Sequence, residues 1–376
     1  MKKKGYYIHL KLRENQVGVR QKIDGQIAVL RQYFDVLEID VKKEKINILQ
    51  GVLSRLPFGS YAMDYDSAFA QIDNPDFVYI RHKAVDRRYF RFLKMIREKY
   101  PSVKMLLEIP TYPYKGELLM NKTMWPFYFK DAFRRHGLKH IADRIVTLTG
   151  DDIIFGMPTI KIQNGILVDT ISPVAAHEDT ASIDLIAVSA CLPAHGYERC
   201  IQGLADYYGN SSIEHQIVKF HMVGEGEELG LYKSLVKKYH LEENVYFYGK
   251  KTGKELDAVY DRADIAMGAF GLYKIKATRS STLKVKEYLA KGLPIISGSY
   301  EDSFENSDVD FYLGFANDGS PVDIRKVIRF YERILHKYKT REILRDRIRM
   351  YAREKVDMAV VMKPVVDYIM EVRSEG

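Results

Sequence analysis

The sequence predicts an α/β protein built from two doubly wound domains, in which parallel strands alternate with helices. Short apolar runs rich in Val, Ile and Tyr recur along the chain with Gly, Pro or Asp at their ends, which is typical of strands. The runs are almost continuously apolar, as in parallel strands that are covered on both faces. Longer segments with apolar residues at helical spacing lie between them. A chain of 376 residues also corresponds to two domains at about 150 residues each.

The predicted strands divide into two sets. The first set covers residues 6–10, 36–41, 77–82, 104–109 and 144–149, and the second covers 183–190, 218–224, 244–249, 263–270, 293–299 and 310–315. Amphipathic helices are expected at 85–100 and 196–208, and only helices after about residue 325. The small and polar segment 169–184 is the expected boundary. We therefore predict domains at 1–170 and 171–355, and a terminal helix at 356–376 that crosses back to the first domain.

The charge is distributed unevenly. The net charge is +8, and residues 1–170 contain 29 Lys and Arg against 19 Asp and Glu, so the excess basic charge lies in the first half. An anionic partner could explain this asymmetry, namely a nucleic acid, a membrane surface or a phosphorylated acceptor. The alternative is a soluble protein with generic basic charge. No basic zipper, zinc finger or aromatic RNA-binding strand is present, so we expect no nucleic-acid partner.

The cysteine content and the hydropathy of the chain argue against a disulfide-rich, zinc-binding, membrane-spanning or secreted protein. Cys191 and Cys200 are too few for a disulfide framework or a four-ligand zinc site, and a reducing compartment is expected. No run approaches the roughly 18 apolar residues of a membrane span. The start MKKKGYYIHLKL lacks the apolar core and cleavage site of a signal peptide. These features predict a cytoplasmic protein.

The segment SSTLKVKEYLAKGLPII, residues 280–296, carries a distinct chemical pattern. Ser280–Thr282 offer N-cap residues for a helix that Gly292 ends. The start of such a helix suits a phosphate, because it offers free amides and the positive end of the helix dipole, and Lys284 adds charge there. Glu287, one turn further on, could accept hydrogen bonds from the ribose of a nucleoside diphosphate. The alternative is a surface Lys–Glu pair at positions i and i+3.

This segment resembles the donor-site motif of GT-B glycosyltransferases, especially glycosyltransferase family 4 and its capsular and exopolysaccharide relatives. DRIVTLTGDDI and PTIKIQNGI resemble the end of the N-terminal domain in that family. IAVSACLPAHGYERCIQGLADYY resembles the first strand, loop and helix of the C-terminal domain, in a subgroup with a His-Gly-Tyr-Asp/Glu-Arg signature. FHMVGEGEEL, NVYFYGKKT, NQVGVRQKIDGQI and LLEIPTYPY resemble further segments in the same order. The resemblance covers most of the chain and implies two Rossmann-like domains that face a central cleft.

The resemblance implies a donor site formed mainly by the second domain. Glu287 corresponds to the glutamate that binds the ribose hydroxyls, and the strand end near Tyr248 would lie by the base. The loop that holds Gly18 would approach the phosphates from the other domain. The complete set of donor-binding candidates is Gly18, His195, Gly196, Tyr248, Gly249, Lys250, Ser281, Thr282, Leu283 and Glu287.

The sequence departs from the family at two places. The family often has two glutamates separated by seven residues, and the first of these falls on Arg279. The arginine and lysine that often grip the pyrophosphate fall on Ala190 and His195. Our hypothesis is that the lost charge is supplied by other cations, since a guanidinium can bind phosphate through two hydrogen bonds. The candidates for this catalytic role are Arg199, Arg279 and Lys284. The alternative for Arg199 is a solvent-facing helix residue, and the alternative for His195 is a structural role.

Acceptor-side candidates lie at or near the ends of predicted strands in the first domain. They are Lys22, Arg81, His82, Tyr112 and Tyr114 as acceptor-binding residues, with Glu108 as a catalytic residue that would orient an acceptor hydroxyl. The alternative for Glu108 is that it only pairs with Arg81. The alternative for the two tyrosines is a rigid loop between prolines.

The resemblance also implies the reaction and the partners. The expected activity is a retaining hexosyl transfer from a nucleotide sugar, with UDP as the commonest nucleotide and with no metal or other cofactor. The expected acceptor is a glycan or a lipid-pyrophosphate-linked glycan in bacterial surface polysaccharide synthesis. The basic face of residues 87–97, with Arg134, Arg135 and Lys139, could contact anionic lipid at the inner face of the plasma membrane. The alternative is a solvated basic face.

Two other functions are compatible with the same fold. One is a non-catalytic protein that binds a nucleotide sugar or a glycan, and the other is a GT-B nucleotide-sugar epimerase. A dinucleotide-dependent dehydrogenase is disfavoured, because the first strand is followed by NQVGVRQ and not by a Gly-x-Gly-x-x-Gly turn.

Overall fold

A computed structural model describes residues 2–13, 16–45, 47–54, 56, 59–82, 84–115, 125–175, 181–209 and 215–372. The chain divides by its contacts into two compact units. Unit 1 consists of Met1–Gln163 with Val361–Gly376, and unit 2 of Asn164–Val360. The sheets are parallel in both units apart from one hairpin, which confirms the predicted fold class.

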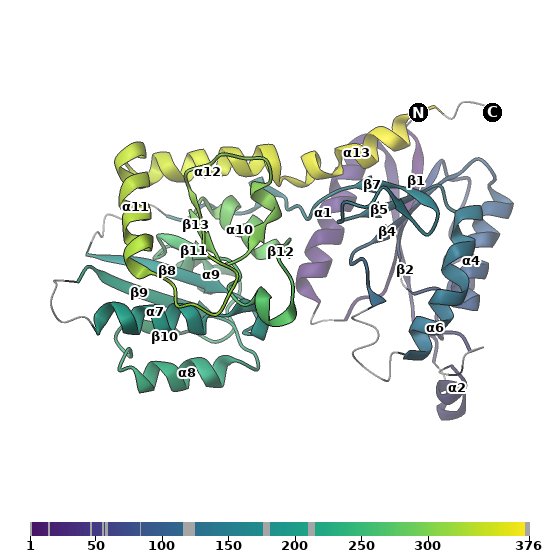
Figure 1. The fold of residues 1–376 in the computed structure, drawn as a ribbon. Coiled ribbons are helices and arrows are strands. Elements are labelled where there is room, and N and C mark those ends of the chain that lie inside the picture. The colour runs from purple at the N-terminus through teal and green to yellow at the C-terminus, as the bar shows by residue number, and fades with distance from the viewer. Residues whose placement is uncertain are drawn as a thin grey trace. The chain divides into compact units, whose positions relative to one another are not determined.

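Unit 1 contains a seven-stranded sheet in the order β2-β1-β3-β4-β5-β7-β6, which is parallel except for the β6–β7 pair. The first five strands follow the doubly wound order 2-1-3-4-5. Figure 1 shows α1 on one side of this sheet and α4 and α6 on the other. The elements are β1 (Lys4–Leu10), α1 (Val17–Tyr33), β2 (Asp35–Val41), α2 (Ile48–Leu53), α3 (Tyr65–Ala70), β3 (Phe77–Arg81), α4 (Arg87–Lys99), β4 (Lys104–Ile109), α6 (Trp125–Arg134), the 3-10 helix η2 (Arg135–His140), β5 (Arg144–Thr147), β6 (Ile153–Ile154) and β7 (Met157–Lys161).

Unit 2 contains a six-stranded parallel sheet in the order β10-β9-β8-β11-β13-β15 and a two-stranded ladder of β12 and β14. This is the doubly wound order 3-2-1-4-5-6. Figure 1 shows α7 and α8 on one side of the sheet and α10 and α12 on the other. The elements are η3 (Val168–Thr170), β8 (Ser182–Val188), η4 (Pro193–His195), α7 (Glu198–Tyr208), β9 (Ile217–Val223), α8 (Leu229–Lys238), β10 (Val245–Phe247), α9 (Gly253–Tyr260), β11 (Ile265–Met267), η5 (Leu272–Ile275), β12 (Arg279–Ser280), α10 (Leu283–Lys291), β13 (Ile295–Ser297), β14 (Tyr300–Glu301), η6 (Asp302–Phe304), β15 (Tyr312–Gly314), α11 (Ile324–Tyr338), α12 (Arg341–Lys355) and α13 (Met358–Met370), whose last residues pass to unit 1.

Every apolar run that the sequence marks as a strand overlaps a strand of the structure. The short elements β6, β7, β12 and β14 were not predicted. β7 has the sequence MPTIK, with partly polar alternation and a proline, and so lacks the continuous apolarity of a central parallel strand. The remaining three strands have only two residues each, too few for any periodic pattern.

The boundaries between units differ from the predicted ones at 170/171 and 355/356. Residues 164–170 belong to unit 2, because Ile166 forms a β-bridge with Asp357 and Val168 is buried in the unit 2 core. The segment 169–184 is therefore not a linker between the units. Its Val174 amide donates to the Lys291 carbonyl at 3.0 Å, while residues 176–180 lie outside the described residues.

The end of the chain packs on unit 1. The Lys104 ammonium donates to the carbonyls of Tyr368 at 2.5 Å and Glu371 at 2.7 Å, and Lys3 donates to Ile369 at 2.6 Å. Lysines at these positions satisfy backbone carbonyls that have no partner inside the last turn of a helix.

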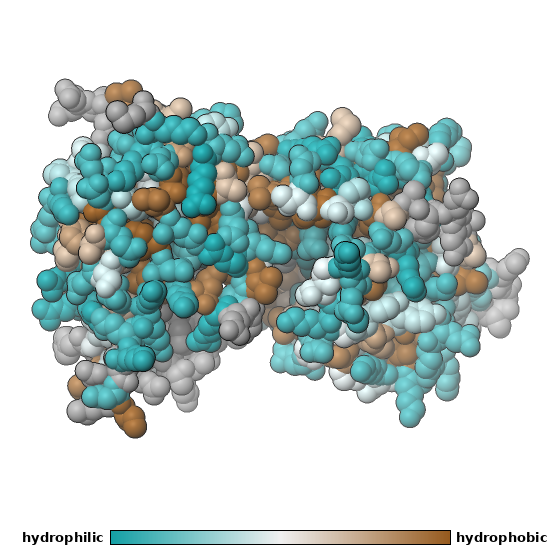
Figure 2. Space-filling view, turned by 180° about the vertical axis from the view of Figure 1, so that it is seen from behind, coloured by the Kyte–Doolittle hydropathy of each residue, from teal (hydrophilic) through white to brown (hydrophobic). Residues whose placement is uncertain are grey.

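The surface of the protein carries exposed apolar side chains at several positions. Figure 2 shows that hydrophilic residues predominate on the face in view and that hydrophobic residues form separate groups among them. Among the described residues, no helix has both the length and the apolar character that crossing a membrane would require.

Candidate donor-binding and acceptor-binding sites

Helix α10 begins as the sequence predicts, but its N-terminus is not closed by a side chain. Thr282 is the N-cap residue in an extended conformation and makes no side-chain cap hydrogen bond. Gly292 ends the helix in the left-handed region with φ 84°. The hydroxyls of Ser280, Ser281 and Thr282 are buried, and none has a hydrogen-bond partner in the described part of the chain. The first turn of α10 therefore keeps the positive end of its dipole and receives no hydroxyl cap.

Glu287 projects from the first turns of α10 and accepts a hydrogen bond from the Tyr260 hydroxyl at 3.1 Å. Burial raises the pKa of Glu287 above its ordinary value, and the Tyr260 hydrogen bond and Lys291 oppose this rise only in part. Lys291 itself pairs with Asp257 at 2.6 Å. No ion pair of Glu287 is recorded within the described ranges, so the surface Lys–Glu pair considered as an alternative is wrong. A half-buried carboxylate of this kind is suited to accept hydrogen bonds from ligand hydroxyls.

Lys284 reaches across from α10 to the loop that follows β8. Its ammonium donates to the Tyr197 hydroxyl at 3.0 Å and to the Gly268 carbonyl at 3.3 Å. His195 stacks on the Tyr197 ring with centroids 5.7 Å apart. Burial, followed by the nearby Lys284 charge, lowers the pKa of His195 to about 3. His195 is therefore neutral near pH 7 and cannot replace a phosphate-binding cation, whereas Lys284 can.

Gly196 brings two loops of unit 2 into direct backbone contact. It adopts φ 62°, and a Cβ atom there would lie 2.4 Å from the Gly271 nitrogen. The adjacent His195 carbonyl accepts from the Phe270 amide at 2.8 Å. Only glycine permits both this φ and this approach, so the predicted site residue Gly196 has at least a structural reason to be glycine.

We expect Gly196→Ala to lower the free energy of unfolding by more than about 1 kcal/mol, since the new methyl group meets backbone atoms and the φ angle is strained. Urea denaturation would measure this. Gly230→Ala is the matched control, because Gly230 lies in α8 and no atom lies within 4 Å of its added Cβ. Equal stability of the two variants would contradict the backbone contact.

The two arginines predicted to act in catalysis have internal partners. Arg199 is 2% exposed and donates to the Ser320 carbonyl at 2.5 Å and to the Phe270 carbonyl at 2.9 Å. These contacts fit a structural role in place of the predicted catalytic one, and they also exclude the solvent-facing alternative. Arg279 is exposed and pairs with Glu305 at 2.5 Å. Of the three predicted cations, Lys284 is therefore the one that the structure places beside the start of α10 and the loop after β8.

The side chain of Tyr248 faces a pocket on the sheet. Its hydroxyl lies 2.8 Å from His221 Nδ1, and His221 Nε2 lies 2.6 Å from Asp184. A pocket of about 390 Å³ is lined by Asp184, Lys219, His221, Tyr246, Tyr248, Asp261 and Arg262. His221 and Asp184 were not among the residues predicted from the sequence, because they lie inside apolar strand runs.

Gly249 takes φ 64° and its carbonyl accepts from the Gly224 amide at 2.8 Å, while Lys250 is exposed.

In unit 1 three of the acceptor-side candidates form one buried charge cluster. Glu108 Oε1 lies 2.9 Å from Lys22 Nζ and 3.1 Å from Arg81 Nη1, and Tyr79 donates to Oε2 at 2.9 Å. Glu108 is fully buried, which by itself would raise its pKa, but Lys22 and Arg81 together hold the pKa at about 2. Glu108 is thus ionised and pairs with two cations, more than the single Arg81 pair considered as an alternative.

Gly18 is not in a loop as predicted but in the first turn of α1.

The side chains of the other acceptor-side candidates have different partners, although the His82 amide donates to the Glu108 carbonyl at 2.8 Å. His82 is buried against Tyr89, at 3.3 Å from its hydroxyl, and burial lowers the pKa of His82 to about 3. Tyr112 and Tyr114 pack edge to face with Phe155. They line a pocket of about 340 Å³ together with Pro113, Lys115, Arg135, His136, Phe155 and Gly156. The side chains of the acceptor-side candidates therefore do not form a single cluster.

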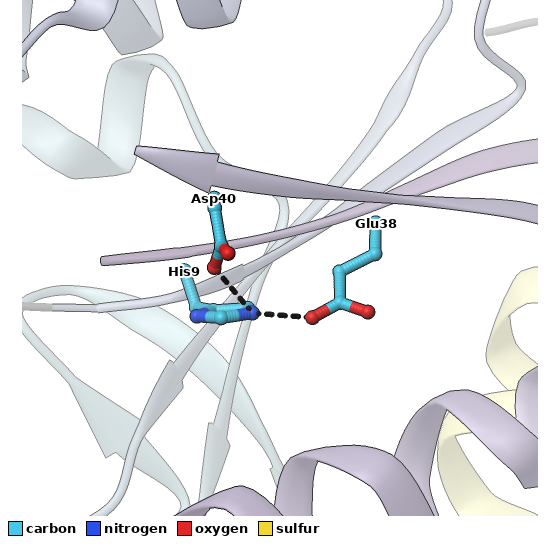
Figure 3. Close-up of side chains that lie close together, drawn as sticks. All are labelled: His9, Glu38 and Asp40. Atoms are coloured by element: carbon cyan, nitrogen blue, oxygen red, sulfur yellow. Dashed lines mark hydrogen bonds and ion pairs between the residues drawn. The ribbon is translucent and has the colours of Figure 1, made fainter. Parts of the chain in front are cut away.

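One group of side chains in unit 1 has the composition of a metal site. Figure 3 shows His9 Nε2 between two carboxylates, 2.9 Å from Glu38 and 3.3 Å from Asp40. His9 Nδ1 lies 2.9 Å from the Leu10 carbonyl, so it carries a proton. Arg20 also pairs with Glu38 at 2.6 Å and helps hold the pKa of that carboxyl at about 2. Arg20 therefore supplies a positive charge beside Glu38 within the protein, and it also contacts Asp24.

Comparison with known proteins agrees with this architecture. Residues 172–354 match the family model of the glycosyl transferases group 1, and these residues lie within unit 2. A comparison with the curated proteins finds no match to this chain.

Solved structures resemble the whole chain in fold. A glycosyltransferase from Rickettsia africae is 13% identical with a TM-score of 0.61 and covers 100% of both chains. HepE from Anabaena, solved in complex with UDP, is 11% identical with a TM-score of 0.62 over 98% of this chain and 100% of that one. Sucrose-phosphate synthase from Thermosynechococcus elongatus is 15% identical with a TM-score of 0.58 over 98% and 99%. Because these sequence identities are so low, the similarities show a shared fold and nothing further.

The match over residues 172–354 contains α10 and the loops around it, which are the residues that sequence analysis assigned to the donor site. Residues 172–354 thus match the glycosyl transferases group 1 model, within a chain that has the GT-B fold of two Rossmann-like domains.

Proposed function

We propose that the protein is a retaining glycosyltransferase that transfers a sugar from a nucleotide-diphosphate sugar, with UDP as the expected nucleotide, to a glycan or lipid-linked glycan. The observation that carries this proposal is the group 1 match across α10, where an uncapped helix start, Lys284 and Glu287 occur within one segment. The UDP bound in the HepE structure supports the choice of nucleotide.

The start of α10 would bind the diphosphate. Its dipole and the Lys284 ammonium offer positive charge where negative charge develops on the departing nucleoside diphosphate. Glu287 would accept hydrogen bonds from the ribose hydroxyls, and Tyr260 would hold its carboxylate in place. In this mechanism the helix amides and Lys284 do the work that a metal ion performs in other transferases. The donor phosphate oxygen would assist deprotonation of the acceptor hydroxyl on the same face of the sugar.

Unit 1 would bind the acceptor. The Lys22, Arg81 and Glu108 cluster carries two cations against one carboxylate, so one positive charge remains for an anionic group of the acceptor. Tyr112 and Tyr114 present rings on which a sugar could stack. A lipid-pyrophosphate-linked glycan in surface polysaccharide synthesis would use both features, and such an acceptor would place the protein at an anionic membrane.

Calorimetric titration of the purified chain with UDP, GDP, CMP and dTDP, without added metal, tests the donor site. We expect binding of UDP in preference to the other three nucleotides. Incubation with UDP-sugars and lipid-linked glycans should then show transfer to an acceptor. No binding of any nucleotide by folded protein would contradict the proposal.

A second function is favoured by two observations. Arg279 stands where the family often has a glutamate, and Arg199 donates to the carbonyls of Ser320 and Phe270 inside the protein. A non-catalytic protein that binds nucleotide sugars would tolerate both features. Nucleotide binding without transfer or hydrolysis of any donor would identify it.

A further inference from the structure

Helix α6 exposes a row of aromatic side chains to solvent. Trp125, Phe129 and Phe133 are 42%, 59% and 83% exposed. They are four residues apart and so lie on one face of the helix. A soluble surface rarely presents three large aromatic rings together, and such groups usually mark an interaction surface.

Exposed apolar side chains also occur on α2. Ile48 and Val52 of α2 are 89% and 55% exposed. Lys130 of α6 donates to the carbonyl of Ser54 at 2.5 Å, so the residue that follows α2 lies beside α6. Figure 2 shows hydrophobic atoms projecting at the lower left, the part of unit 1 where Figure 1 places α2. We call these five exposed apolar residues the aromatic stripe. Its aromatic members are Trp125, Phe129 and Phe133 of α6, and its aliphatic members are Ile48 and Val52 of α2.

Cations border the aromatic stripe. Lys42, Lys43 and Lys45 lie three to six residues before the start of α2 at Ile48 and are exposed, and no ion pair of theirs is recorded among the described residues. The Arg134 guanidinium lies 5.5 Å from the Phe133 ring centre. Glu44, the carboxylate between these lysines, is neutralised by Arg88 at 2.5 Å. The border of the stripe is therefore basic.

The basic face that sequence analysis assigned to lipid is partly neutralised inside the protein. Arg88 pairs with Glu44, Arg97 pairs with Asp143 at 2.7 Å, and Arg135 pairs with Asp131 at 3.5 Å. An apolar face with basic residues at its edge is the pattern of helices that lie in the headgroup region of an anionic membrane. Tryptophan and phenylalanine are the residues such helices insert.

We propose that the aromatic stripe of α6 and α2 inserts into an anionic lipid surface and so docks unit 1 on the membrane. This inference extends the membrane contact of the proposed function. Its test needs neither donor nor acceptor, so failure of lipid binding and failure of glycosyl transfer are distinguishable.

Trp125 is the single tryptophan of the chain, so intrinsic fluorescence reports on α6 directly. Mixing the full chain with phosphatidylcholine–phosphatidylglycerol vesicles should shift Trp125 emission to shorter wavelength, and brominated lipid should quench it. Pure phosphatidylcholine vesicles should bind less, and added NaCl should weaken binding to the anionic vesicles, because the basic border contributes.

The test variant is the double substitution Phe129→Asp and Phe133→Asp. Vesicle co-sedimentation should fall by about tenfold or more, since two apolar rings are replaced by charges that anionic lipid repels. The matched control is Leu231→Asp with Ile343→Asp, two exposed apolar residues on α8 and α12 of unit 2, which should bind vesicles as the unmodified chain does. Circular dichroism and calorimetric titration with UDP would verify that both variants remain folded.

Three results would overturn the proposal. The unmodified chain could fail to bind anionic vesicles, or the control pair could lose binding as fully as the test pair. Light scattering could also show a dimer in the absence of lipid that the test pair abolishes, in which case a second copy covers the aromatic stripe.

Discussion

Glu287→Ala is expected to weaken nucleotide binding by at least about tenfold, because hydrogen bonds to a charged carboxylate contribute about 1.5–3 kcal/mol each. Glu287 is half-buried at the start of α10, accepts from Tyr260 and has no ion pair recorded in the described part of the chain. Its raised pKa shows that burial disfavours the charge, so a ligand that donates hydrogen bonds to it would recover that cost. Calorimetric titration with UDP would measure the loss.

The matched control for this experiment is Glu255→Gln. Glu255 lies on α9, is exposed and, among the residues that the structure describes, forms one ion pair, with Lys251 at i, i+4 and 3.3 Å. Its substitution should leave UDP affinity unchanged, because exposed pairs contribute little. Tyr260→Phe should have a small effect, since it removes one hydrogen bond to Glu287 and keeps the carboxylate. Unchanged affinity in Glu287→Ala would refute the ribose assignment while leaving the fold untouched.

Glu108→Gln is expected to lower the free energy of unfolding by about 3–5 kcal/mol, because it leaves two buried cations without their carboxylate. Lys22 and Arg81 both contact Glu108 Oε1, and all three side chains are largely buried. Urea denaturation at pH 7 would measure the change. Glu98→Gln is the control, as Glu98 is exposed on α4 and pairs only with Lys94. If Glu108→Gln lowers the free energy of unfolding no more than Glu98→Gln does, the assignment of Glu108 to a buried charge cluster is contradicted.

The cluster of Lys22, Arg81 and Glu108 also predicts how the stability of the folded protein depends on pH. The pKa of Glu108 is about 2 in the folded protein, against an ordinary value of 4.5. Because the folded value is lower, the cluster stabilises the fold above pH 4.5, and this contribution of about 3 kcal/mol is lost as the pH falls from 4.5 towards 2. Glu108→Gln should lack this part of the acid sensitivity. Denaturation curves of both proteins across that pH range would show the difference.

The sequence alone predicted the elements whose signal is local. Strands such as 104–109 and 293–299 are recognisable because burial on both faces requires nearly continuous apolar residues. The end of α10 follows from Gly292, since a left-handed C-terminal residue is a local signal. The hydroxyl residues before Leu283 marked the start of the helix correctly, although none of them caps it through a side chain. Glu287 was found in the same way, because its distance from the helix start is fixed by helix geometry.

Only the tertiary structure decided which distant residues meet. Nothing local to Glu108 shows that Lys22, many positions earlier on α1, shares its oxygen with Arg81. Arg199 has the sequence context of a phosphate ligand, yet packing turns its guanidinium towards Ser320 and Phe270. Helical spacing shows that Trp125, Phe129 and Phe133 share a face, but exposure depends on which helices and loops cover it. Local propensity and capping act through neighbours in the chain, whereas charge pairing and burial depend on contacts that exist only after folding.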